Sequence, residues 1–254
     1  MTDLQENRSM SNGLLHGGQD AYLIEWGYPD RSDRYLTLDD YINGYIDGCV
    51  DYIRARHGLD SINILGICQG GTFSLCYSAI HPEKVNALVT MVTPIDFKTP
   101  DNMLSHWVQQ VDIDLLVDTV GNVSGEMLNW TFLNLKPYHL TSLKYLSMVD
   151  LMQDVDQMKN FMRMEKWIFD SPDQAGEAYR QFIKDFFQEN RFISTGSLKT
   201  IRMESQGVPL AARCLYRSVC LILRLRIRGL SSRDMPSKDA FGLPSFSLKN
   251  SGWR

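Results

Sequence analysis

The chain has 254 residues, of which 44% are hydrophobic, so it is long and apolar enough for one α/β domain with an inserted subdomain. Its formal net charge of -4 argues against nucleic acid as the main partner. The five cysteines are odd in number and form no paired framework, and there is neither a signal peptide nor an apolar run of about 18 residues. We therefore expect a cytoplasmic protein with free thiols and no transmembrane segment.

The first sixty residues predict a strand and a long amphipathic helix. Residues 21–27 (AYLIEWG) are typical of a strand. Thr37 precedes a leucine and two aspartates and is suited to cap a helix whose apolar positions recur every three or four residues up to Ile53. His57 and Gly58 then end this helix with a basic last turn and a left-handed cap.

The next stretch contains the candidate catalytic residue. An apolar strand (62–66) enters Gly66-x-Cys68-x-Gly70-Gly71, and a helix (72–80) follows. This is the G-x-S-x-G nucleophile elbow with cysteine in place of serine, in which glycines let strand and helix approach closely around a strained nucleophile. We predict Cys68 as the nucleophile, its thiolate favoured by the helix N-terminus, and the N–H of Gln69 as one oxyanion-hole donor. The alternative is a buried structural cysteine in a glycine-rich turn.

A further buried strand (87–94) completes a strand–helix–strand–helix–strand pattern, which predicts βαβ units in a parallel sheet. Three strands are too few for a stable doubly wound sheet, so the sheet is expected to be incomplete. Beyond it the pattern is helical, with stretches at 103–120, 124–135, 141–149, 156–169 and 174–187.

We interpret the helical region as a cap over the elbow, and most of its aromatic residues as packing within that cap. These aromatic residues include Trp107, Trp130, Phe132, Tyr138, Phe161, Trp167 and Phe186. The expected organisation is a partial α/β core (1–96), a helical cap (97–193) and a tail (194–254).

The tail differs in charge from the rest of the chain. Residues 1–193 carry 15 Lys and Arg against 27 Asp and Glu, whereas residues 194–254 carry 11 against 3. The tail is also rich in Ser, Arg and Leu. We hypothesise that the reading frame shifts near residue 193 and that Met1 is an internal methionine taken as a start; a genuine, divergent basic tail is the alternative.

Several stretches together resemble the catalytic subunit of the class III poly(3-hydroxyalkanoate) synthases. The matching stretches are YLIEWGYP (22–29), LTLDDY (36–41), GICQGG (66–71), NWTF (129–132) and MEKWIFDSP (164–172). The long, near-continuous match makes the resemblance specific. It implies an α/β-hydrolase fold with a cap, and an activity that joins 3-hydroxyacyl groups from coenzyme A thioesters into polyester.

The resemblance also implies roles and partners. Cys68 would be acylated by the substrate and by the growing chain, and no metal or resident cofactor would be needed because the coenzyme A thioester is the substrate. Members of this family work with a second, non-catalytic subunit and associate with polyester granules in the cytoplasm. They activate the cysteine with a histidine, supported by an aspartate that also assists the 3-hydroxyl of the incoming monomer, and both residues lie after the cap. A loop near the N-terminus supplies the other oxyanion donor.

The catalytic partners of Cys68 have no matching positions. No histidine follows His139, and Asp234 and Asp239 lie in no comparable context. The five histidines are interpreted as helix ends, surface or cap residues, and none is assigned as the base: His16, His57, His81, His106 and His139.

Three functions remain open on these grounds. The first is a polyester synthase subunit, and the second is a catalytically dead fragment or scaffold subunit of the same family. The third is a thioesterase or other hydrolase with a cysteine elbow, against which the matched stretches outside the elbow argue. Because the nucleophile lacks its base and the sheet has unpaired edges, we expect these 254 residues alone neither to fold stably nor to turn over.

Overall fold

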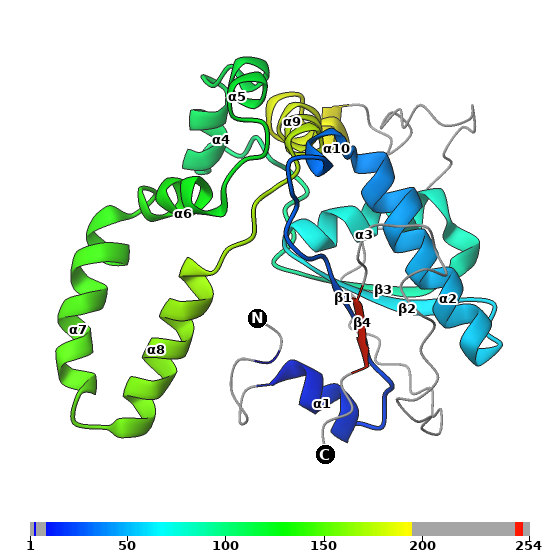
Figure 1. Ribbon diagram of the computed structural model, residues 1–254, viewed down its shortest axis with the longest axis horizontal. Helices are drawn as coiled ribbons and strands as arrows, with labels where there is room; N and C mark the ends of the chain where they lie inside the picture. Colours follow the sequence, from blue (N-terminus) through cyan, green and yellow to red (C-terminus); the bar gives the residue numbers. More distant parts are fainter. Residues whose placement is uncertain (1–2, 4–8, 195–246, 251–254) are drawn as a thin grey trace. The chain divides into compact units, whose positions relative to one another are not determined.

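The computed structural model describes residues 3, 9–194 and 247–250 (Figure 1). Backbone contacts divide the chain into two compact units. The elbow unit contains residues 29–123 and 174–194, and the hairpin unit contains the described residues up to 28 together with 124–173 and 247–250. A division by contacts does not identify domains, so the boundaries expected at 96 and 193 stay a prediction. Most of the tail (194–254) lies outside the described residues.

The elbow unit begins with the predicted long helix, which follows the short 3-10 turn η2 (Asp33–Tyr35). It consists of a π-helical stretch, η3 (Asp40–Ile46), that continues into α2 (Asp47–His57). The Thr37 hydroxyl accepts a hydrogen bond from the Asp40 N–H at 3.2 Å, and the Asp40 carboxylate accepts one from the Thr37 N–H at 2.8 Å. These reciprocal bonds form a capping box, which confirms Thr37 as the cap. Gly58 ends α2 with a φ of 61°, the predicted left-handed cap.

Two parallel strands and the helix between them carry the elbow. Strand β2 (Ile62–Ile67) leads into α3 (Gln69–Ile80), and the short turn η4 (Pro82–Lys84) leads into β3 (Val85–Met91). The strands pair in parallel, with Ile64 opposite Leu88, and α3 packs on both of them (Figure 1). The predicted βαβ unit is thus confirmed, although α3 begins at Gln69 rather than at Thr72.

Strand β3 is less buried than the sequence predicts. Val89 is 46% exposed, Met91 42% and Val92 76%. The prediction of a buried strand at 87–94 is therefore wrong for its second half. The reason is that this sheet has two strands within the described residues, so much of its apolar surface has no covering layer.

The first predicted strand does not join this sheet. Strand β1 (Tyr22–Glu25) lies in the hairpin unit and pairs antiparallel with β4 (Ser247–Asn250). This corrects the expectation that the strand at 21–27 belongs to the parallel sheet. A free strand edge presents unpaired N–H and C=O groups, and pairing with β4 satisfies those along one edge of β1.

The core of the elbow unit is aromatic. Phe97, which is fully buried, packs against Phe182, Phe186 and Phe187, and Phe182 in turn contacts Phe73 of α3. The three partners of Phe97 belong to α9 (Gly176–Phe182) and to the π-helical stretch η6 (Ile183–Gln188), and α10 (Arg191–Ser194) follows. The predicted helix at 174–187 is thus present, and it packs on the elbow helix.

The predicted helix at 103–120 consists of two helices. They are α4 (Met103–Val108) and α5 (Ile113–Val120), separated by residues 109–112. Asp112 explains the break because its carboxylate accepts a hydrogen bond from the Leu115 N–H at 3.0 Å and so starts a new helix.

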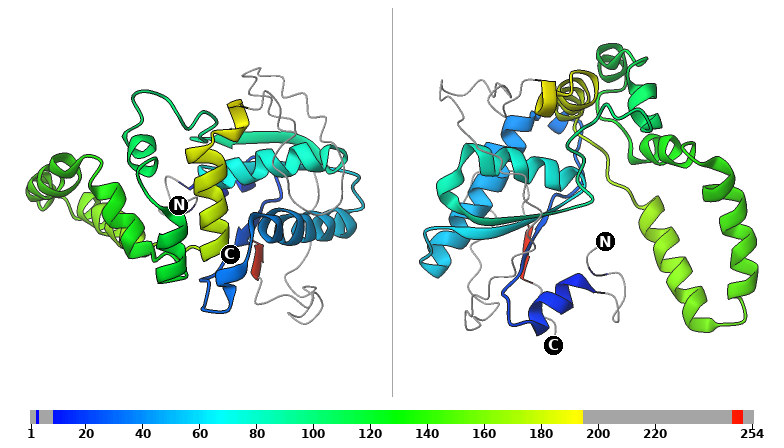
Figure 2. Two further views of the ribbon diagram at one scale, coloured as in Figure 1. Left: turned by 90° about the horizontal axis from the view of Figure 1, so that it is seen from above. Right: turned by 180° about the vertical axis from the view of Figure 1, so that it is seen from behind.

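The hairpin unit contains α1 (Met10–His16), α6 (Gly125–Leu133), the π-helical stretch η5 (Tyr138–Leu143), α7 (Lys144–Leu151) and α8 (Val155–Phe169). Helices α7 and α8 run side by side as a helical hairpin (Figures 1 and 2). The Glu165 carboxylate links them, since it accepts hydrogen bonds from Lys144 and Tyr145. Within the described residues no helix is both long and apolar enough to cross a membrane.

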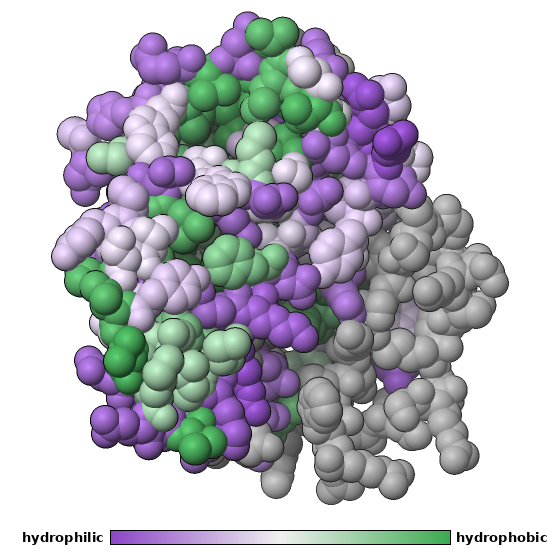
Figure 3. Space-filling view, turned by 60° about the vertical axis from the view of Figure 1, so that its left-hand side comes forward, coloured by the Kyte–Doolittle hydropathy of each residue, from purple (hydrophilic) through white to green (hydrophobic). Residues whose placement is uncertain are grey.

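The aromatic residues of the hairpin unit are not packed as predicted. Trp130 is 61% exposed and Tyr138 62%, and Phe132 and Trp167 are also exposed. On the face drawn in Figure 3, hydrophobic side chains form patches between hydrophilic ones. The interpretation as packing within the cap is wrong for these four residues, because their side chains are exposed in the described part of the chain. Among the aromatic residues named for the cap, Phe186 is fully buried, and it lies in the elbow unit.

Candidate functional site

Cys68 occupies the strained position expected of an elbow nucleophile. Its φ is 53° and its ψ is -123°, a conformation that side-chain-bearing residues rarely adopt. The surrounding backbone fixes it: the Cys68 N–H donates to the Met91 carbonyl at 3.0 Å, and the Cys68 carbonyl accepts from the N–H groups of Gly71 and Thr72. The side chain is exposed. The alternative of a buried structural cysteine is therefore wrong.

Two glycines make the turn between β2 and α3 sterically possible. A Cβ on Gly66 would lie 2.6 Å from the Gly71 Cα and 2.7 Å from the Gly70 carbonyl oxygen. A Cβ on Gly71 would lie 1.8 Å from the Thr93 hydroxyl oxygen. A Cβ on Gly70, in contrast, would meet no atom within 4 Å. Of the two glycines that follow Cys68, Gly71 is thus the one at a close approach, and Gly70 is not.

Gln69 is placed to supply an oxyanion-hole donor. It is the first residue of α3, and the first N–H groups of a helix have no intrahelical acceptor. Its backbone N–H therefore remains available next to the Cys68 thiol, at the positive end of the helix dipole. Its side chain is engaged separately, because its Nε2 donates to the Oε1 of Gln174 at 3.3 Å.

Two features next to the elbow were missed by the sequence reasoning. Val92 follows the Met91 carbonyl that binds Cys68, and its φ of 46° is an outlier for a β-branched residue. Gln174 contacts the elbow from a position 105 residues along the chain. No local sequence signal indicates either feature.

The contacts of the histidines do not identify a base for Cys68. His81 pairs through Nε2 with the Asn43 amide oxygen at 3.0 Å and packs on the ring of Tyr77. His106 pairs with the carbonyl of Pro100 at 3.0 Å. His57 ends α2, and the two remaining histidines belong to the hairpin unit.

The described residues also contain no group of three or more His, Cys, Asp or Glu side chains that could hold a metal ion.

The other cysteines of the described chain differ from Cys68 in burial. Cys49 and Cys76 are buried, and this desolvation raises the pKa of Cys49 to about 11 and raises that of Cys76 further. A thiol with a raised pKa rarely forms the thiolate that acts as a nucleophile. Cys68 is thus the exposed thiol among these three.

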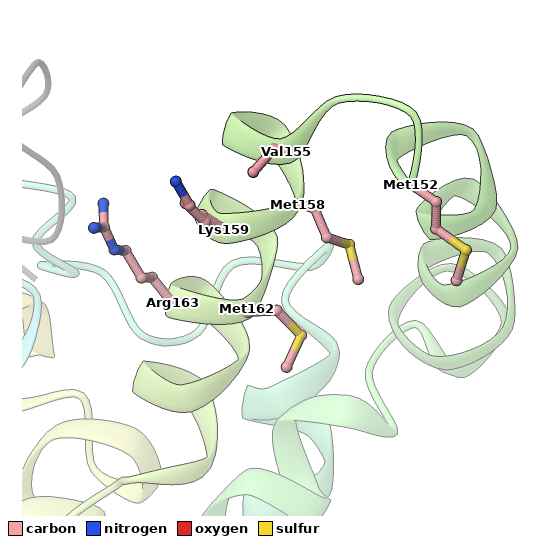
Figure 4. A pocket seen from close by; sticks show the side chains of 6 residues that line it. All are labelled: Met152, Val155, Met158, Lys159, Met162 and Arg163. Atoms are coloured by element: carbon pink, nitrogen blue, oxygen red, sulfur yellow. The ribbon is translucent and has the colours of Figure 1, made fainter.

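A hollow on the helical hairpin is the other candidate for a site. It has a volume of about 450 Å³ and opens on the surface of α8 and the end of α7 (Figure 4). Its lining consists of Met152, Val155, Met158, Lys159, Met162 and Arg163. Its lining contains no cysteine, serine, histidine or carboxylate, so it lacks the thiol or hydroxyl nucleophile and the base that an elbow-type acyl transfer uses.

Comparison with known proteins gives one family match and several relatives. The family described as the alpha/beta hydrolase fold matches residues 2–197. The poly(3-hydroxyalkanoate) polymerase subunit PhaC of Allochromatium vinosum is 71% identical over 196 residues, which are 77% of this chain and 55% of that protein. The protein of the same name from Thiocystis violacea is 68% identical over 196 residues, with the same coverage of both chains. That from Synechocystis is 55% identical over 199 residues, or 76% of this chain and 53% of that protein. The chain thus spans about half the length of the curated relatives it matches.

Proposed function

The chain belongs to the α/β-hydrolase fold family, and from this premise we propose that it is the nucleophile-bearing part of a poly(3-hydroxyalkanoate) polymerase. The observation that carries the proposal is the exposed Cys68 thiol, held at a φ of 53° between β2 and α3. The names of the relatives, poly(3-hydroxyalkanoate) polymerase subunits, favour acyl transfer into a polyester over hydrolysis.

The proposed reaction starts with a thioester exchange. The Cys68 thiolate attacks the carbonyl carbon of a 3-hydroxyacyl-coenzyme A, and the carbonyl oxygen becomes an oxyanion that the Gln69 N–H binds. The carbon–sulfur bond to coenzyme A then breaks, and the coenzyme A thiolate leaves and takes up a proton. The acyl group remains on Cys68 as a thioester, so the energy of the original thioester bond is retained for ester formation.

Ester formation needs a base that activates the 3-hydroxyl of the next acyl group. The resemblance implies a histidine that activates the cysteine and an aspartate that also assists this 3-hydroxyl, both after the cap, and no histidine follows His139 in this sequence. We therefore propose that these 254 residues by themselves carry out at most the first acylation. Sustained polymerisation belongs to a polypeptide that also contains the base.

The remaining parts of the proposal concern partners and location. The relatives are named as subunits, which supports assembly with a second synthase subunit. We further propose that the protein works in the cytoplasm on polyester granules, with the coenzyme A thioester as substrate and without a resident cofactor.

The test is covalent labelling of the purified chain by 3-hydroxybutyryl-coenzyme A. Released coenzyme A is measured with a thiol reagent, and the acylated peptide is located by mass spectrometry after an acid quench. We expect one acyl group on Cys68 and one coenzyme A released per chain, with neither in Cys68→Ala. Cys49→Ala serves as the matched control, because Cys49 is a buried thiol, and it should label like the wild type.

Other outcomes distinguish the competing functions. A chain that folds but is not acylated contradicts the proposal and supports a scaffold subunit. Repeated release of coenzyme A with free 3-hydroxybutyrate as product supports a thioesterase instead. Repeated release with polymer as product overturns the limit to a single acylation.

A further inference from the structure

The chain leaves the elbow unit after Val123 and returns to it at Gln174, and these two residues are bonded to each other. The Val123 N–H donates to the Gln174 carbonyl at 2.9 Å, and the Gln174 N–H donates to the Val123 carbonyl at 2.8 Å. Val123 is fully buried. Both backbone polar groups of Gln174 are thus satisfied within the elbow unit, which fixes the starting point of its side chain.

The backbone beside this bridge is closely packed. A Cβ on Gly176 would lie 2.4 Å from the Gly121 carbonyl oxygen, so the two segments touch backbone to backbone. The Asn122 side chain adds a hydrogen bond to the Gly176 N–H at 3.1 Å. Two residues after Gln174, the chain is therefore held by a second set of contacts, and Gln174 has little freedom to shift.

From this fixed position the Gln174 side chain reaches the elbow. Its Oε1 accepts a hydrogen bond from the Nε2 of Gln69 at 3.3 Å. Gln69 directly follows Cys68, and its own N–H is the proposed oxyanion donor. The bond therefore connects a distant segment to the residue that carries this donor.

We propose that Gln174 is a positioning residue that orients Gln69 and thereby the oxyanion-hole N–H beside Cys68. The inference rests on the proposed function, because it requires that the Gln69 N–H binds an oxyanion. The first turn of a helix lacks half of its backbone hydrogen bonds and frays most easily. A side-chain anchor at its first residue reduces this motion.

Two reactions of the same thiol separate this role from a general structural one. Acylation by an activated ester such as p-nitrophenyl acetate passes through an oxyanion, whereas alkylation by iodoacetamide displaces iodide at a saturated carbon and forms none. An oxyanion donor accelerates the first reaction and not the second. Both are followed on the full chain at about pH 9, where cysteine thiols in general ionise without a base, with the Cys68 peptide quantified by mass spectrometry.

The variants are Gln174→Met, Gln69→Met and the double substitution. Methionine has a similar length to glutamine and lacks the amide, while Gln69→Met keeps the backbone N–H. We expect each single variant to slow acylation roughly 3- to 10-fold, the effect of one neutral hydrogen bond, and to leave alkylation unchanged. The double variant should be no slower than either single one, since both remove the same contact.

Gln188→Met is the matched control, because the Gln188 amide bonds to the carbonyls of Val108 and Val111 rather than to the elbow. It should leave both reactions unchanged. Equal acylation rates in wild type and Gln174→Met, multiplicative effects in the double variant, or parallel losses in acylation and alkylation would each overturn the inference. If the wild type is alkylated but not acylated, both the proposed oxyanion donor and this inference are wrong. If the wild type is acylated and Gln174→Met is acylated at the same rate, only this inference is wrong.

Discussion

The backbones of Gly66 and Gly71 are in close contact where β2 meets α3, and neither position has space for a side chain. A Cβ on Gly66 would lie 2.6 Å from the Gly71 Cα and 2.7 Å from the Ser74 hydroxyl oxygen. The strand can therefore approach the helix closely enough for the chain to turn within one residue. That residue is Cys68, and the sharp turn keeps its side chain exposed.

The steric difference between neighbouring glycines gives the first prediction. Gly66→Ala should destabilise the protein by about 1–3 kcal/mol, because the new methyl group meets backbone that must shift. Gly70→Ala is the matched control and should be neutral or slightly stabilising, since a Cβ there meets no atom within 4 Å and alanine favours helix. Urea unfolding of both variants measures this. Equal destabilisation by the two substitutions would contradict the close approach at Gly66.

The backbone conformation of Cys68 gives the second prediction. Its φ of 53° and ψ of -123° suit glycine, so Cys68→Gly should raise the free energy of unfolding by about 1 kcal/mol relative to Cys68→Ala. Both variants should fail to be acylated. Thermal unfolding of the pair provides the comparison, and a more stable Cys68→Ala would show that the elbow is not strained.

The loop after β3 depends on Asn190. This residue is 7% exposed and has a φ of 51°, and its side chain accepts a hydrogen bond from the Phe97 N–H and donates one to Asp96. Asn190→Gly keeps the backbone conformation and loses both bonds, so a cost of about 1–3 kcal/mol is expected. Asn190→Ala should cost about 1 kcal/mol more because of its positive φ. If denaturant titrations find the alanine variant the more stable of the two, this account of Asn190 is wrong.

Asp185 gives a prediction on pH dependence. Burial raises the pKa of its carboxyl above the usual value, and the ion pair with Arg191 at 3.0 Å does not outweigh that desolvation. A pKa that is higher in the folded than in the unfolded state means that stability is lost as pH rises through the folded value. Asp185→Asn should therefore be more stable than the wild type at about pH 7, and the difference should vanish toward about pH 4.

The check is a series of unfolding midpoints for wild type and Asp185→Asn across this pH range. Asp150→Asn is a suitable control, because Asp150 is exposed on α7 and takes no part in the ion pair with Arg191. A wild type that is the more stable protein at neutral pH would show that the pair with Arg191 dominates instead.

Local patterns were read correctly from the sequence. Thr37 as a cap, Gly58 as a left-handed helix end and the strand–turn–helix around Cys68 all match the structure. These features depend on hydrogen bonds and steric contacts between residues a few positions apart, so their signals are present in the sequence itself. The same holds for the exposed nucleophile candidate, because the elbow motif implies the backbone that exposes it.

Features that depend on distant contacts were not predicted. The pairing of β1 with β4, the exposure of Trp130 and the contact between Gln69 and Gln174 each depend on which elements come together. The apolar residues of a helix recur with the same period whether another layer covers them or not. The sequence around a glutamine likewise does not indicate a hydrogen-bond partner 105 residues away. Local sequence thus predicts the strand–turn–helix around Cys68, whereas the contact that anchors it follows from the fold, because only folding brings segments far apart in the chain within hydrogen-bonding distance.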